Sequence, residues 1–175
     1  MKKIIKYGLL LGAGLFLSGC SSESSSTKPF NSTKHYTQEL KAVRKEKYKK
    51  GKMLNHSEMK LLLALEEALR GKDYRIVLQT SLGAFLNHKE KKAFLAVNCK
   101  RADFVIMNRF AYPEAVIEYN GEGHYQNNSS LRDDIKSLSC QSADLPFIQI
   151  SFHDKNNFEE VIKEKVLPVL YKAKS

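Results

Sequence analysis

Residues 101–120 read RADFVIMNRFAYPEAVIEYN: two short β-rich runs, 101–107 and 114–119, on either side of the proline-containing stretch NRFAYP. Six residues is a suitable length for the connection of a hairpin. If the runs pair about the midpoint of this turn, Asp103 and Glu118 lie directly opposite each other, where Cβ atoms are about 4.5–5.5 Å apart. The sequence therefore predicts a hairpin that carries one acid on each strand.

Two carboxylates at that distance repel each other, and the pKa of one of them rises unless a cation lies between them. Mg²⁺ is a hard cation that takes oxygen ligands and would relieve this repulsion. The spacing is equally compatible with side chains that diverge to opposite faces of the sheet, or with acids that meet a lysine or an arginine. Spacing alone leaves these arrangements open.

The sequence on both sides of the hairpin predicts an α/β domain over residues 53–175. Asn55 followed by Glu58 has the spacing of a helix-capping box, and leucines recur at helical intervals after it. The expected elements are helix 57–69, strands 74–79, 82–86, 101–107 and 114–119, a charged turn at 88–92, helix 131–138, strand 146–152, and a C-terminal helix from residue 158 that Pro168 kinks or ends. We expect them to form an α/β sandwich with a central mixed β-sheet flanked by helices.

The N-terminus has the organisation of a bacterial signal peptide. Lysines precede an apolar run, 7–17, that is shorter than the ~20 residues of a membrane-spanning helix. The run ends in LSGC (17–20), which resembles the lipobox whose cysteine is acylated and becomes the first mature residue. The resemblance implies a signal peptide over 1–19 and a lipid anchor in the cell envelope through Cys20. Ser21 is not the aspartate of inner-membrane retention, which implies the periplasmic side of the outer membrane in a bacterium with two membranes; an ordinary secreted protein or a membrane anchor is the alternative.

Positive charge is concentrated in residues 20–52, between the signal peptide and the domain. The chain has a formal net charge of +10. Residues 34–52 contain eight Lys or Arg against two Glu, whereas 53–175 carry a net charge of only +1. With the polar stretch 21–33 before it, this segment is typical of a tether. Its cations either lie near lipid phosphates on a partly helical spacer or form an electrostatic funnel for nucleic acid.

Four motifs occur in order within residues 54–152: RADFVI (101–106), VIEYNGEGHYQ (116–126), RDDIK (132–136) and LPFIQI (145–150). In this combination they resemble the PD-(D/E)XK nuclease superfamily, and within it an uncharacterised bacterial group related to the very-short-patch-repair endonucleases. The resemblance implies a restriction-endonuclease-like fold and hydrolysis of phosphodiester bonds in DNA, with Mg²⁺ or Mn²⁺ as the cofactor.

The resemblance also implies roles for individual residues. Asp103 and Glu118 correspond to the metal-binding acids of the two central strands, and the backbone carbonyl of Tyr119 often completes such a site. Glu58 matches an acid that many members carry on the first core helix, facing the sheet. Its position is equally explained by the capping box with Asn55, and one side chain does not fully serve both purposes.

Asn120 stands where the superfamily has the lysine of its Glu-x-Lys motif. An amide carries no charge, so Asn120 cannot replace a lysine that positions water and stabilises negative charge on the phosphoryl group. Lys136, one helical turn after Arg132, is the candidate replacement, because related families recruit a catalytic lysine from this element. The alternatives are that Lys136 is a surface residue, or that the fold is a degenerate nuclease retained for binding.

The loop after the second strand of the hairpin contains the remaining candidates. In the very-short-patch-repair relatives a histidine after this strand acts in the site, so the resemblance implies that His124 is a general base, a metal ligand or a phosphate contact. The residues expected to contact substrate are Asn120, Tyr125, Gln126 and Arg132.

Cys99 and Cys140 are the cysteines of the domain. An exported protein can oxidise such a pair, but the sequence does not show the two within reach of each other. No Cys or His spacing suggests structural zinc.

The leading hypothesis is a membrane-anchored, metal-dependent nuclease with DNA as its partner. The alternative is a catalytically inactive lipoprotein that uses the same fold to bind nucleic acid or protein. Asn120 and the nearly neutral domain favour the alternative, whereas the joint presence of Asp103, Glu118, Lys136 and His124 favours the enzyme.

Overall fold

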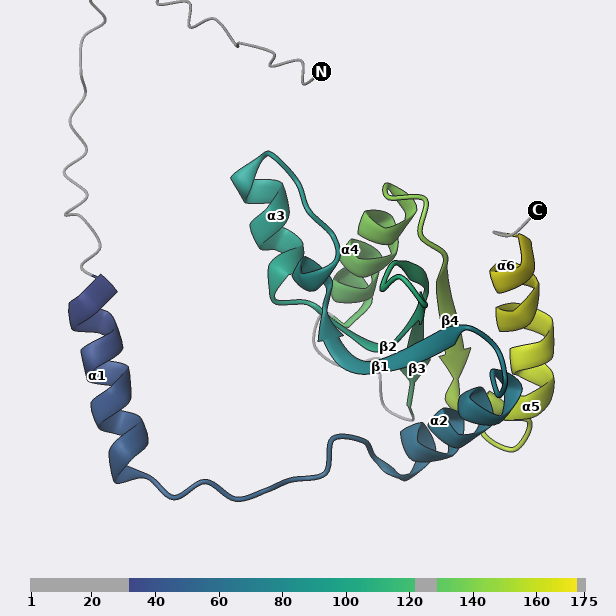
Figure 1. The fold of residues 1–175 in the computed structure, drawn as a ribbon, viewed down its shortest axis with the longest axis horizontal. Helices are drawn as coiled ribbons and strands as arrows, with labels where there is room; N and C mark the ends of the chain where they lie inside the picture. The colour runs from purple at the N-terminus through teal and green to yellow at the C-terminus, as the bar shows by residue number, and fades with distance from the viewer. Residues whose placement is uncertain (1–31, 122–128, 173–175) are drawn as a thin grey trace, which may run out of the picture. The chain divides into compact units, whose positions relative to one another are not determined.

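The structure is a computed structural model that describes residues 32–121 and 129–172 (Figure 1). The chain divides into two units, residues 1–49 and 50–175, and each is described by itself.

Helix α1 (Ser32–Lys45) is the described element of the first unit. Its apolar residues Tyr36, Leu40 and Val43 recur at helical spacing, which places them on one side of the helix, and all three are exposed. Arg44 and Lys45 lie in its last turn, where cations interact favourably with the C-terminal end of the helix dipole. The tether is therefore helical over part of its length.

The second unit contains the predicted helices and strands in the predicted order, except that the strand expected at 82–86 is absent and one further helix is present. Its elements are α2 (His56–Ala68), β1 (Tyr74–Ser81), the 3-10 turn η1 (Leu82–Ala84), α3 (Lys91–Asn98), β2 (Arg101–Asn108), β3 (Pro113–Asn120), α4 (Ser129–Gln141), β4 (Phe147–Ser151), the 3-10 turn η2 (Phe152–Asp154), α5 (Phe158–Val161), the π-helical turn η3 (Ile162–Val166) and α6 (Leu167–Lys172).

The four strands form one mixed sheet in the order β1-β2-β3-β4. The first three strands are antiparallel neighbours, and β4 runs parallel to β3. A parallel pair needs a crossover connection, and α4 lies between β3 and β4 in the chain. The α/β architecture with a mixed sheet and flanking helices, predicted from the sequence, is confirmed.

The hairpin of β2 and β3 has the predicted register. Phe104 pairs with Ile117 and Val105 with Val116, so the next pair of this register is Asp103 with Glu118. The register shifts only near the turn, between Ile106 and the following residue.

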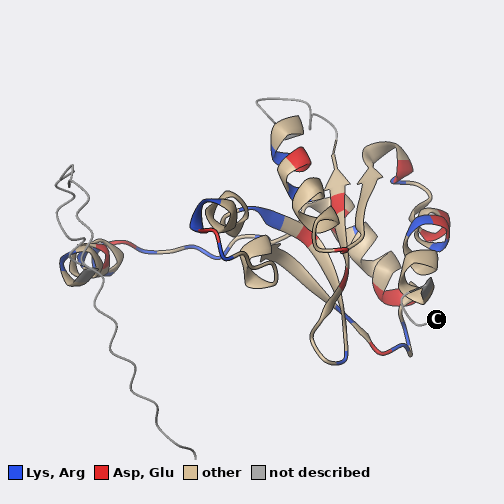
Figure 2. Cartoon of the chain, turned by 90° about the horizontal axis from the view of Figure 1, so that it is seen from above, with Lys and Arg blue, Asp and Glu red and all other residues tan. Residues whose placement is uncertain are grey.

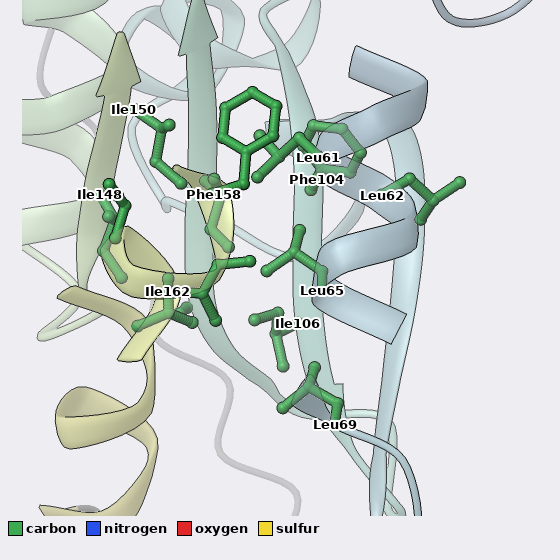
Figure 3. Packing of buried hydrophobic residues seen from close by; sticks show 14 of the residues in the cluster. Leu61, Leu62, Leu65, Leu69, Phe104, Ile106, Ile148, Ile150, Phe158 and Ile162 are labelled. Atoms are coloured by element: carbon green, nitrogen blue, oxygen red, sulfur yellow. The ribbon is translucent and has the colours of Figure 1, made fainter. Parts of the chain in front are cut away.

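Two apolar layers cover the two faces of the sheet. Side chains alternate along each strand, so Phe104 and Ile106 pack on one face and Val105 on the other. The first layer holds α2 and the C-terminal helices, as Figure 3 shows for Leu61, Leu65 and Phe158 against the strands. The second layer includes Val97 of α3 and Cys140 of α4.

Helix α2 begins as the sequence predicts. The side chain of Asn55 accepts hydrogen bonds from the backbone N–H groups of Ser57 and Glu58, both at 2.9 Å, and the Glu58 carboxylate accepts one from the backbone of Asn55 at 2.7 Å. Leu61 and Leu65 are fully buried. The capping box therefore fixes the start of the helix, and burial of its leucines holds it on the sheet.

The prediction of a strand at 82–86 is wrong. The backbone N–H groups of Phe85 and Leu86 both donate to the carbonyl of Leu82, at 3.1 and 2.7 Å, which closes a tight turn. Gly83 packs so closely on α3 that a Cβ at this position would lie 2.8 Å from the Cα of Asn98. An apolar run thus becomes a turn because of a contact with a helix that the sequence did not reveal.

Helix α3 was not predicted. The charged stretch 88–92 was expected to be a turn, but α3 begins within it at Lys91, and of its eight residues only Val97 is buried. An element with so little buried apolar surface leaves a weak periodic signal.

Pro168 does not end the C-terminal helix, which continues as α6 to Lys172. Proline lacks the N–H that would bond to the carbonyl four residues earlier, and the turn before it, Ile162–Val166, is π-helical.

Candidate active site

Asp103 and Glu118 lie on the same face of the sheet. Each is two residues from a valine of the second layer, Val105 on β2 and Val116 on β3, and residues two apart on a strand point to the same face. Of the arrangements that the spacing left open, divergence to opposite faces is therefore excluded. Figure 2 shows the acidic residues of the sheet as red segments of the strands and the basic residues as blue segments.

Helix α4 covers this face with polar side chains. Leu131 and Leu138 are 60% and 63% exposed, so its leucines point away from the sheet. Asp133 and Lys136, whose side chains are 13% and 12% exposed, lie with buried Cys140 on the opposite side of the helix. The helix was predicted correctly, but its sheet-facing side is the polar one.

Lys136 meets Glu118 in a buried ion pair. The Nζ atom of Lys136 donates a hydrogen bond to Oε1 of Glu118, whose side chain is only 4% exposed. The same Nζ lies 3.7 Å from Oδ1 of Asp133. Lys136 is therefore not a surface lysine. It places a positive charge next to Glu118, which the uncharged amide of Asn120 cannot supply.

Burial dominates the ionisation of Glu118. Burial, and after it the negative charge of Asp103, together raise the pKa of this carboxyl from 4.5 to about 7, although Lys136 partly opposes both effects. Oε2 of Glu118 is buried and has no hydrogen-bond partner among the described residues. A cation or a proton at this oxygen would give it a partner and would neutralise the buried negative charge.

Asp103 is held from both neighbouring strands. Its Oδ1 accepts a hydrogen bond from the side-chain amide of Gln79 on β1 at 3.1 Å, and its Oδ2 accepts one from the backbone N–H of Tyr119 on β3 at 3.0 Å. Each carboxylate oxygen keeps a second lone pair for another partner.

Gln79 is a functional candidate that the sequence did not reveal. It has a φ of 48° inside β1, a left-handed backbone conformation that usually costs a non-glycine residue about 1–3 kcal/mol. A glutamine in a β-rich run has no motif around it, so no sequence signal singled it out.

A pocket of about 450 Å³ opens beside the acids. Its lining contains four cationic side chains, two carboxylates and one thiol: Lys100, Arg101, Arg132, Lys136, Asp103, Asp133 and Cys99. This excess of positive charge suits an anionic ligand such as a phosphate group. Arg132, expected to contact substrate, lies in this lining.

Glu58 lies at the N-terminus of α2, where its carboxylate serves the capping box with Asn55. Among the contacts described for residues 32–121 and 129–172, none joins Glu58 to Asp103 or Glu118. The capping explanation of this acid therefore accounts for its observed contacts.

Two further predicted residues follow Glu118 on β3. The hydroxyl of Tyr119 and Oδ1 of Asn120 are buried without a hydrogen-bond partner in the described part of the chain. The ring of Tyr119 packs edge-on against Phe158, with centroids 6.0 Å apart, so this side chain belongs to the opposite layer. Only the backbone of Tyr119 faces the acids.

The remaining predicted site residues lie outside the described residues. These are Cys20, His124, Tyr125 and Gln126.

The acids offer a partial site for a divalent cation. Asp103 and Glu118 supply carboxylate oxygens, one of them unpartnered, which suits a hard ion such as Mg²⁺. Across the two described stretches, no group of three or more His, Cys, Asp or Glu side chains is placed to hold a metal. Further ligands would have to be backbone oxygens, such as the Tyr119 carbonyl, or water.

The cysteines of the domain are unpaired. Cys99 is exposed and Cys140 is buried, and both are free thiols. Burial, and then the charge of Glu118, raises the pKa of Cys140 to about 11, so this thiol stays protonated at neutral pH.

No helix in the described stretches combines the length and the apolar character needed to cross a bilayer.

Comparison with known proteins identifies relatives without an assigned activity. An uncharacterised protein of Haemophilus influenzae is 42% identical over 105 residues, 59% of this chain and 55% of that protein, so the match spans about half of the relative's length. An uncharacterised protein of Sinorhizobium fredii is 26% identical over 100 residues, 56% of this chain and 72% of that protein. No solved structure matches the chain significantly.

The family model described as "Protein of unknown function (DUF2726)" matches residues 50–166. That range is more than half of the chain and contains the whole cluster of Asp103, Glu118 and Lys136. The chain therefore belongs to the DUF2726 family.

Proposed function

We propose that the domain hydrolyses phosphodiester bonds of DNA in a reaction that depends on a divalent cation, and that its fold is of the restriction-endonuclease-like type. One observation carries the proposal: Asp103, Glu118 and Lys136, from two adjacent strands and a crossover helix, meet beside a pocket with mostly cationic lining. Two acids and a lysine beside a basic pocket are the components that this chemistry needs.

Each residue has a distinct part in the proposed reaction. Asp103 and Glu118 would hold Mg²⁺ or Mn²⁺, with the Tyr119 carbonyl as a further ligand. When bound, such an ion polarises the phosphoryl oxygens and lowers the pKa of a coordinated water. Lys136 supplies positive charge for the phosphoryl group, and Arg132 binds phosphate at the pocket. His124 stays a predicted participant.

The decisive experiment combines thermal melts with cleavage assays on single- and double-stranded DNA, each with and without Mg²⁺ or Mn²⁺. An ion that binds only the folded protein stabilises it by RT ln(1 + [L]/Kd), about 2.7 kcal/mol at one hundred times Kd. Asp103→Asn should lose this gain and the cleavage together. Lys136→Met should keep the gain while losing cleavage, because Lys136 is not assigned as a ligand.

Asp73→Asn is the matched control, because Asp73 is an exposed acid paired with Arg109 at the edge of the sheet. It should keep both the metal response and the cleavage. A wild-type protein that shows neither would contradict the proposed enzyme.

A binding module without catalysis is the second candidate, and Asn120 favours it because the motif lysine is absent from β3. This function predicts that DNA binding depends neither on divalent ions nor on Lys136. It also predicts that neither the wild type nor any variant forms product in the cleavage assay.

We also propose that Cys20 is acylated and anchors the domain in the cell envelope, facing the periplasm from the outer membrane where two membranes exist. The support is the LSGC junction after a short apolar run. Labelling of cells with a fatty-acid probe should mark the wild type and not Cys20→Ala; label on the variant would contradict the anchor.

A further inference from the structure

Three non-glycine residues in the described stretches have a positive φ: Gln79, Ala111 and Asp144. Ala111 lies in the turn of the β2–β3 hairpin, and Asp144 in the connection between α4 and β4. Turns commonly use the left-handed region, whereas the interior of a strand does not. Gln79, with φ 48° within β1, is the exception that the fold does not explain.

The irregularity is confined to this one residue. Leu78 pairs with Phe104 and Thr80 with Ala102, so the ladder is in the same register on both sides of Gln79. The half-buried side chain of Gln79 donates to Oδ1 of Asp103 at 3.1 Å. The strand thus departs from extended geometry at the residue that contacts the acid.

We infer that Gln79 is a positioning residue, which orients the Asp103 carboxylate for a divalent cation. The inference rests on the proposed function. Gln79 holds Oδ1 from β1 while the backbone N–H of Tyr119 holds Oδ2 from β3, which fixes the plane of the carboxylate. Left-handed backbone in an otherwise regular strand is the kind of strain that persists at functional sites.

The chemistry of the amide suits this task. A lysine or arginine at position 79 would also donate to Asp103, but it would neutralise the charge that attracts a cation. The Gln79 amide donates without carrying charge, so the carboxylate keeps its full negative charge and a free lone pair on each oxygen. Outer-shell partners of this kind typically change metal affinity by about 10–100-fold.

The test uses Gln79→Gly and Gln79→Asn in the full chain. Glycine accepts a φ of 48° without strain, and asparagine tolerates this region but is one methylene too short to reach Asp103. Both variants should melt, without metal, at or above the wild-type temperature. Both should bind Mn²⁺ about 10–100-fold more weakly by calorimetry. Ala111→Gly is the control: it relieves the same backbone strain in the hairpin turn, and it should leave Mn²⁺ affinity unchanged.

Every result decides between the roles. Unchanged Mn²⁺ affinity in both variants overturns the inference, and a marked loss of metal-free stability in both assigns Gln79 to the fold instead. A wild-type protein that binds Mn²⁺ but does not cleave DNA overturns the proposed enzyme alone, since the role of Gln79 is then read from Mn²⁺ affinity. A wild-type protein that binds no Mn²⁺ overturns both.

Discussion

Glu118 is the residue at which burial and charge conflict most directly. Its pKa in the folded protein is about 7, against 4.5 for the free side chain, so the folded protein holds this proton more tightly than the unfolded chain. The stability that protonated Glu118 contributes is fully present below pH 4.5 and is lost as the pH rises through 7. Ionised Glu118 therefore destabilises the folded protein, and a bound cation would remove this effect.

Glu118→Gln should become progressively more stable relative to the wild type as the pH rises from 5 to 8. The wild type loses about 2–3 kcal/mol over this range from Glu118 ionisation, by the pKa difference, and glutamine has no such ionisation. Urea unfolding in the presence of EDTA at both pH values measures the difference. Parallel pH profiles for the two proteins would show that Glu118 does not titrate in this range.

Lys136→Met should destabilise the protein by about 3–5 kcal/mol at pH 8, because it leaves a buried carboxylate without its partner. The loss should be clearly smaller at pH 5, where Glu118 is protonated. Lys165→Met is the control, since Lys165 is exposed and lies 3.8 Å from the partly exposed Asp154, in a pair that should contribute less than about 1 kcal/mol. Equal effects at pH 5 and pH 8 would contradict a charge-based role for Lys136.

At the scale of elements, α4 shows why helical periodicity did not reveal the site. Its apolar residues Leu131, Ile135 and Leu138 fit a helix that buries leucines, yet all three are exposed. The helix instead brings Asp133 and Lys136 to the sheet. A charged face is buried here because Glu118 on β3 supplies an opposite charge.

Helix α2 buries its apolar side against the sheet, so shortening a leucine to alanine should have different effects on its buried and exposed sides. Leu65→Ala should cost about 2–5 kcal/mol of stability, because Leu65 is fully buried against the sheet. Leu63→Ala, on the same helix and 53% exposed, should change stability by less than about 0.5 kcal/mol. Chemical denaturation of both variants checks this, and similar losses would contradict the observed orientation of α2.

At the scale of the whole molecule, most of the net positive charge lies outside the domain, and residues 34–52 carry the largest share of it. If this segment supplies the affinity for DNA, a chain that begins at Met53 should bind more weakly and with a flatter salt dependence than residues 21–175, because fewer counterions are released. Fluorescence anisotropy with labelled DNA at several salt concentrations measures both slopes. Equal slopes would leave the basic segment as a spacer.

The sequence by itself determined the parts of this protein that depend on local chemistry. The capping box at Asn55, the hairpin of β2 and β3, and the opposition of Asp103 and Glu118 all follow from spacing, turn length and strand alternation. These features are set by residues close in the chain, so a single sequence contains the information.

Only the tertiary structure decided which residues join those acids. Lys136 reaches Glu118 because the crossover helix lies over that face of the sheet, and Gln79 reaches Asp103 because β1 pairs beside β2 and departs from extended geometry at one residue. The turn at Leu82 likewise depends on contact between Gly83 and α3. Each of these is a contact between segments distant in the chain, whose energy arises from packing and charge in three dimensions and leaves no periodic pattern in the sequence.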